Sequence, residues 1–194
     1  MTLLPLLFAA LLAPAELHSL HWQGVARIYA AKGRMIDVEV STRVTPFQSA
    51  RSDTQLVGEG EASRRSLIID KDGGWIEREG RRDPMPPAML AHERQQYAIY
   101  GLMQQAMVQA APNAVVTLKG PPETEFRFDA AGRLAEARNR VANHEAAGGE
   151  MEQLFVFSGD LASNGLHWPR QIEILQDGQP YFTLILNRFE ATTP

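Results

Sequence analysis

The chain has 194 residues, of which 44% are hydrophobic and 22% charged, and its formal net charge at pH 7 is −4. This length and composition are typical of one globular domain. The acidic balance gives no electrostatic reason to expect nucleic acid as a partner. The sequence has no cysteine, which excludes disulfides, thiolate metal ligands, thiol nucleophiles and a lipidated N-terminal cysteine.

Residues 1–15, MTLLPLLFAALLAPA, have the pattern of a secretory signal peptide. They carry no charged side chain, and their apolar run ends at Ala13-Pro14-Ala15, a small-x-small cleavage pattern. The run is well short of the roughly 20 residues that a membrane-spanning helix needs. We therefore expect a signal peptide over 1–15, one exported domain over 16–194, and no transmembrane span.

Two hairpins are expected next. Residues 24–30 and 35–44 alternate apolar and polar side chains on either side of Ala-Lys-Gly-Arg, which predicts two antiparallel strands with one buried face. Residues 66–70 and 74–79 flank the turn tripeptide Lys71-Asp72-Gly73 and predict a second hairpin.

The pattern changes to that of a helix over residues 88–110, after DPMPP at 83–87. Apolar side chains recur there largely at three- and four-residue spacing, and the segment ends before Pro112. Rich in Tyr and Met, this face fits either a helix packed on a sheet or the wall of an adaptable ligand pocket. Its apolar residues are Leu90, Tyr97, Ile99, Tyr100, Met103, Met107 and Val108.

Six further short strands are expected between residues 114 and 189, joined by turns such as Ala147-Gly148-Gly149 and Asp177-Gly178. With the earlier hairpins they predict an α+β fold that is mostly β. We expect an antiparallel sheet of about nine or ten strands with one long helix.

The last hairpin allows a prediction of register. If Asp177-Gly178 is a two-residue loop, Gln176 faces Gln179, Ile174 faces Tyr181 and Glu173 faces Phe182. Both faces of the hairpin are then substantially apolar, so that the helix, another layer of strands or a bound apolar molecule must cover the second face.

The sequence contains no motif for catalysis or metal binding. The histidines at 18, 21, 92, 144 and 167 lack a metal or catalytic spacing, and phosphate loops, dinucleotide-binding glycines and serine elbows are absent. We therefore expect no cofactor, no metal and no enzyme activity. Hydrolysis through His92 and Glu93, or through His167, is a further hypothesis for which no substrate suggests itself.

Two stretches carry a resemblance to a known family. DKDGGWIEREGRRDPMPPAML resembles the Asp-Gly turn, Trp-bearing strand and helix of the LolA/LolB-like lipoprotein-sorting fold. FSGDLASNGLHWPRQIEILQDGQPYFTLILNRFE resembles the closing strands of related periplasmic proteins. The chain is thus identified as a divergent periplasmic member of this family, whose fold is an unclosed antiparallel half-barrel with helices over the concave face.

The resemblance implies a site and a role. Carriers of the family hold acyl chains between sheet and helices, so Leu90, Tyr97, Tyr100, Met103 and Met107 of the helix would line such a cavity. Phe182, Leu184 and Leu186 of the last strand would face them, and Arg43, in RVTPF, is the nearest match to an arginine at the family's cavity mouth.

Two functions remain open. The first is a periplasmic carrier or binding protein for a lipid, an acyl chain or an acylated protein, without catalysis. The second is a module of the envelope that serves protein-protein interaction or a structural role, with a filled core and no ligand.

Overall fold

The computed structural model describes residues 17–143 and 149–193. The expected signal peptide over residues 1–15 lies outside these ranges. Within them the chain forms fourteen strands, one α-helix and two short 3-10 helices. The helix is α1 (Pro87–Met107), and the 3-10 helices are η1 (Ala31–Gly33) and η2 (Gly60–Ser63). The strands are β1 (Ser19–Ala30), β2 (Arg34–Thr45), β3 (Ser49–Leu56), β4 (Arg65–Ile69), β5 (Gly74–Arg78), β6 (Arg81–Pro84), β7 (Val115–Leu118), β8 (Thr124–Phe128), β9 (Leu134–Ala142), β10 (Glu150–Ser158), β11 (Leu161–Ser163), β12 (Leu166–Trp168), β13 (Gln171–Gln176) and β14 (Gln179–Thr192).

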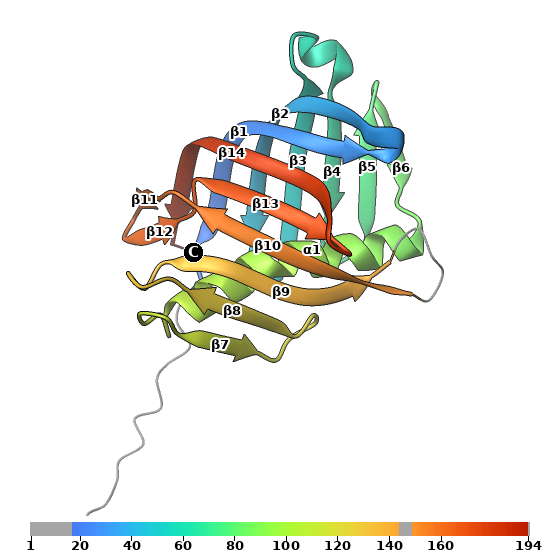
Figure 1. Ribbon diagram of the computed structural model, residues 1–194. Coiled ribbons are helices and arrows are strands. Elements are labelled where there is room, and N and C mark those ends of the chain that lie inside the picture. Colours follow the sequence, from blue (N-terminus) through green and yellow to red (C-terminus); the bar gives the residue numbers. More distant parts are fainter. Residues whose placement is uncertain (1–16, 144–148, 194) are drawn as a thin grey trace, which may run out of the picture.

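Twelve of these strands form one antiparallel sheet in the order β6-β5-β4-β3-β2-β1-β14-β13-β10-β9-β8-β7, and β11 and β12 form a separate pair. The ends of the order are different strands, so the sheet is open. It curves around α1, which lies against its concave face (Figure 1). The expected half-barrel with one long helix is therefore confirmed.

Helix α1 begins with Pro at its first turn, where the missing N–H costs no hydrogen bond. Its C-terminal half is deeply buried. Ile99, Met103 and Ala106, at three- and four-residue spacing, are each 0% exposed. The predicted helix over 88–110 is confirmed, with its end three residues earlier.

The described chain has more strands than the nine or ten that we expect from sequence. Strand β3 is mostly polar, and β6 is the sequence RRDP, whose proline is tolerated because the strand lies at the sheet edge. Strands β11 and β12 have three residues each. None of these segments carries the apolar alternation that identifies a half-buried strand.

The predicted register of the last hairpin is correct at its turn and wrong beyond it. Asp177 and Gly178 have φ of 46° and 75°, as a two-residue hairpin loop requires, and Gln176 pairs with Gln179. One extra residue on β14 then shifts the pairs, so that Ile174 faces Phe182 and Ile172 faces Leu184.

The shift places the four apolar residues of those two pairs on the concave face. The other face carries Gln171, Glu173 and Thr183 together with Ile185, which is 51% exposed. The expectation of a hairpin apolar on both faces is therefore wrong.

Strand β14 carries a second extra residue opposite Gln23 and Gly24 of β1. Gly24 is required there, because a Cβ would overlap the carbonyl oxygen of Ile185. Bulges bend a strand and increase its twist. Two of them on a strand in the middle of the order help the sheet to curve around α1.

Candidate functional site

A cavity of about 280 Å³ lies between the N-terminal half of α1 and the concave face of the sheet. We call it the inner cavity. Strands β1 to β4, β13 and β14 provide its walls. It is lined by Trp22, Ile28, Val40, Thr42, Ser52, Thr54, Arg65, Leu67, Met89, Glu93, Gln96, Tyr97, Tyr100, Ile174, Tyr181, Phe182 and Leu184.

The structure brings four of the predicted cavity residues together around this space: Tyr97 and Tyr100 from α1, and Phe182 and Leu184 from β14. The remaining apolar ones lie elsewhere. Met103 and Leu186 are fully buried in the core, Leu90 lies against Gly74 at the start of β5, and Met107 lines a different pocket.

Arg43 lies away from the inner cavity. Its neighbours Thr42 and Val44 are buried, whereas Arg43 is exposed, so alternation along β2 places it on the outer face of the sheet. There it pairs in register with His21 of β1 and Arg51 of β3.

Polar side chains gather on one side of the inner cavity, where Thr42, Ser52, Thr54 and Arg65 lie beside the apolar Val40 and Leu67 of the same strands, β2, β3 and β4. We call these four polar residues the polar flank. The hydroxyls of Thr42 and Ser52 lie 2.8 Å apart in a hydrogen bond, and Ser52 also bonds to the Tyr97 hydroxyl. The opposite side, from β13 and β14, presents Ile174, Phe182 and Leu184.

Glu93 is the charged residue that α1 contributes to this cavity, and sequence analysis missed it as a cavity residue. It is 9% exposed, and no hydrogen bond or ion pair to its carboxylate occurs within the described ranges. Burial raises its pKa from 4.5 to about 7, and the opposing electrostatic effect of Arg65 is smaller. Its position could have indicated this role, because Glu93 lies four residues before Tyr97 and therefore on the same helix face.

Burial also raises the pKa values of the two tyrosines on α1, and the nearby carboxyl of Glu93 acts in the same direction. Both phenols therefore stay neutral at physiological pH. They can donate and accept hydrogen bonds inside the cavity but carry no charge.

The other flank of α1 is fixed to the sheet by buried polar groups. Nδ1 of His92 lies 2.8 Å from the carbonyl oxygen of Ala142 on β9, and the Ala142 N–H donates to Gln95 at 2.6 Å. Gln153 of β10 donates to Gln96 at 3.1 Å. His92 is thus a buried anchor, 1% exposed, that does not line the inner cavity beside Glu93.

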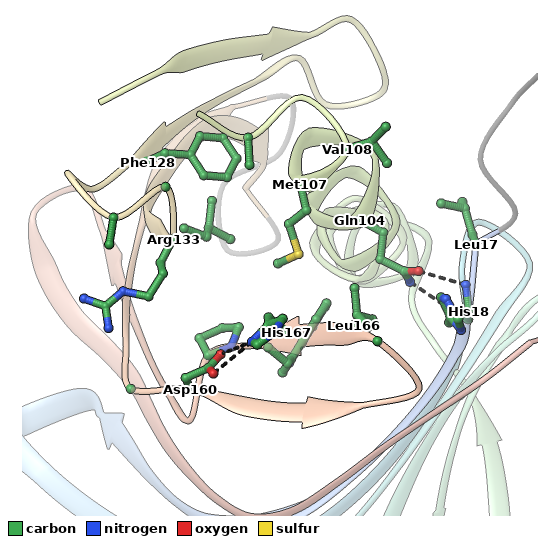
Figure 2. A pocket seen from close by; sticks show the side chains of 18 residues that line it. Leu17, His18, Gln104, Met107, Val108, Phe128, Arg133, Asp160, Leu166 and His167 are labelled. Carbon is green, nitrogen blue, oxygen red and sulfur yellow. Dashed lines mark hydrogen bonds and ion pairs between the residues drawn. The ribbon is translucent and has the colours of Figure 1, made fainter. Parts of the chain in front are cut away.

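A second, larger pocket of about 630 Å³ lies at the C-terminal end of α1 (Figure 2). We call it the end pocket. Met107 points into it from the helix, and His167 lies on the facing wall, where its Nδ1 is 2.9 Å from the Asp160 carboxylate. The His167 side chain is 73% exposed and Val108 is 63% exposed, so this is a pocket of the surface.

Three aromatic rings separate the two spaces. Trp22 and Tyr100 line the inner cavity, and Trp168 lines the end pocket. The ring centroids of Trp22 and Tyr100 are 4.8 Å apart, and those of Tyr100 and Trp168 are 6.1 Å apart. We call these three residues the aromatic partition.

The described residues provide no site for a metal ion, since no three His, Asp or Glu side chains are grouped to hold one. Residues 17–143 and 149–193 also contain no helix that combines the length and the hydropathy needed to cross a membrane. What the geometry offers is burial of an apolar group beside a few fixed polar side chains.

Solved structures similar to the chain include a LolA superfamily protein from Nitrosomonas europaea, with a TM-score of 0.54 and 7% sequence identity over 93% of this chain and 88% of that one. They also include a domain from Vibrio parahaemolyticus described as an outer membrane lipoprotein-sorting protein, with a TM-score of 0.50 and 7% identity over 90% of this chain and 85% of that one. No protein-family model and no curated protein matches the sequence. The chain therefore has a LolA-like fold, in a divergent form.

Proposed function

We propose that this protein is a periplasmic carrier or binding protein that holds an apolar ligand between sheet and helix without chemical conversion. The ligand is a lipid, an acyl chain or the acyl group of a modified protein. The inner cavity carries the proposal, because it lies where the sheet curves around α1 and is lined by Tyr97, Tyr100, Phe182 and Leu184. The signal-peptide pattern of residues 1–15 and the lipoprotein-sorting name of one structural relative support the location.

The size of the cavity favours a single chain. Its 280 Å³ lies just below the roughly 300 to 1,000 Å³ of small-molecule sites. Each methylene that moves from water into it contributes about 0.8 kcal/mol. Burial of a chain that fills the cavity thus favours binding, and the entropic cost of ordering the ligand offsets part of this free energy.

One observation favours a second function, an envelope module that binds a protein partner. In the C-terminal half of α1 the side chains of Ile99, Met103 and Ala106 are fully buried, and an exposed apolar pair, Val25 and Ile185, lies on the outer face. A protein with a filled core could bind a partner through exposed apolar residues on its outer face and would need no small ligand.

Replacing Leu184 with Trp separates the two functions. Trp at this position fills the inner cavity, so a lipid adduct seen by native mass spectrometry of gently purified wild-type protein should disappear. The melting temperature should fall by only a few degrees, because empty space receives the larger ring.

The matched control is Ile185→Trp, the next residue on the exposed face, which should keep the adduct. Unfolding of the Leu184→Trp variant would mean that the core is already filled and would reject the carrier. Repeated preparations of wild-type protein without any adduct would reject it as well.

A further inference from the structure

Glu93 destabilises the fold at its position on α1, where its side chain faces the inner cavity. An unpaired carboxylate loses hydration there and gains no hydrogen bond from the described protein in return. Leu or Met would pack at such a position at no electrostatic cost. A buried acceptor that faces an open space, rather than a protein donor, indicates a donor that arrives with the ligand.

Among the residues that line the inner cavity Glu93 is the acidic one, and several of the polar groups around it already have partners. Thr42 and Ser52 are already hydrogen-bonded to each other, and Ser52 also bonds to Tyr97. Gln96 is engaged with His92 and Gln153. Arg65 is exposed at the rim, where water screens its charge, and it forms no ion pair with Glu93.

The cavity is also asymmetric across the sheet. Its polar flank comes from β2, β3 and β4, whereas Ile174, Phe182 and Leu184 come from β13 and β14 on the other side of β1. Glu93 and Tyr97 of α1 line the same space. A ligand matched to this arrangement has a polar head on one side and a hydrocarbon chain on the other.

We infer that the inner cavity binds a single-chain amphiphile whose head group donates hydrogen bonds to Glu93, with a protonated amine as the preferred head. This inference rests on the proposed carrier function and specifies its ligand class. An ammonium donates charge-assisted hydrogen bonds to the carboxylate, a hydroxyl donates a weaker one, and an anionic head is repelled.

The test compares three probes with the same twelve-carbon chain, a primary amine, a primary alcohol and a carboxylate. Binding is measured by calorimetry below the concentration at which each probe forms micelles, at about pH 8, above the Glu93 pKa of about 7. The wild-type protein should bind the amine tightest. Glu93→Gln should weaken the amine by about tenfold to a hundredfold, since hydrogen bonds to charged groups are stronger than neutral ones.

The alcohol serves as the internal control, because the amide oxygen of the Glu93→Gln variant would still accept its hydrogen bond, and its affinity should change by less than about threefold. Glu39→Gln, which removes a carboxylate from the exposed face of β2, should leave the affinity of every probe unchanged. Equal affinities for the three heads, tighter binding of the carboxylate, or an amine affinity insensitive to Glu93→Gln would overturn the inference while the carrier stands. Failure of all three chains to bind would reject the carrier itself.

Discussion

Glu93 connects the inner cavity to the stability of the fold. Its neighbours on the cavity side of α1 are neutral tyrosines, so its ionisation inside the folded protein is opposed by burial and is helped only by Arg65. The unfolded chain ionises the same carboxyl at its ordinary pKa of 4.5. The difference makes the free energy of unfolding depend on pH.

The sign follows from proton uptake. Between about pH 4.5 and 7 the folded state keeps the proton on Glu93 while the unfolded state has lost it, so the protein should lose stability as pH rises through this window. The loss amounts to on the order of 3 kcal/mol and levels off above pH 7. Urea unfolding at a series of pH values, with wild type and Glu93→Gln in parallel, measures it.

Other carboxyls also contribute to the pH dependence, and comparison with the Glu93→Gln variant subtracts them. Asp53 and Asp129, for example, have pKa values lowered from 3.8 in the folded state, so they act with the opposite sign at more acidic pH. The informative quantity is therefore the difference in unfolding free energy between the two proteins. A difference that stays constant from acidic to neutral pH would show that Glu93 does not titrate in a buried site.

The two flanks of helix α1 have different roles. On one flank Gln95 accepts a hydrogen bond from Ala142 of β9 and His92 bonds to the Ala142 carbonyl. Gln96 accepts a hydrogen bond from Gln153 of β10, and on the other flank Glu93 and Tyr97 line the inner cavity. At its C-terminal end, Gln104 accepts the N–H of His18 at 2.8 Å and donates to the His18 carbonyl at 3.0 Å. The side chain thus pairs with the backbone just before β1 as a neighbouring strand would.

Gln104→Ala should therefore cost about 2 to 4 kcal/mol of unfolding free energy, because it leaves a partly buried N–H and C=O without partners. Gln105→Ala is the matched control. Gln105 is the next residue and is exposed, so its loss should change stability by less than about 0.5 kcal/mol. Denaturant unfolding compares the two variants, and equal stabilities would mean that the Gln104 contacts contribute nothing to the fold.

At the scale of the whole molecule, sequence patterns predicted the long helix and the turn of the last hairpin, and they missed local irregularities of the strands. The four-residue spacing of Ile99, Met103 and Met107 predicted α1 correctly, because each of these side chains is fully or partly buried along one helix face. The Asp177-Gly178 turn placed the last hairpin for a similarly local reason.

The extra residues on β14 had no such signal. Whether a strand keeps or shifts its register depends on how it pairs on both sides, here with β13 and β1. The sequence of β14 alone does not reveal which strands pair with it. The same limit applies to the site. Tyr97 and Phe182 could be predicted as cavity residues from their apolar character and the family resemblance, whereas the role of Glu93 depends on which strands curve over it.

The aromatic partition lies between the two pockets, since Trp22 and Tyr100 line the inner cavity and Trp168, which stacks on Trp22, lines the end pocket. Under the proposed carrier function, we predict that these rings limit the length of the chain that the inner cavity holds. Removing one ring should join the pockets.

Tyr100→Leu is the variant that tests this arrangement. It should cost about 1 to 3 kcal/mol of stability through lost packing, and it should shift the preferred ligand from shorter to longer chains in a series of primary alcohols measured by calorimetry. Tyr29→Leu, on β1 away from both pockets, controls for the loss of a tyrosine and should keep the wild-type preference. A Tyr100→Leu protein that remains folded and prefers the same chain length as wild type would mean that the partition does not limit the ligand, and that the end pocket is a separate feature of the surface.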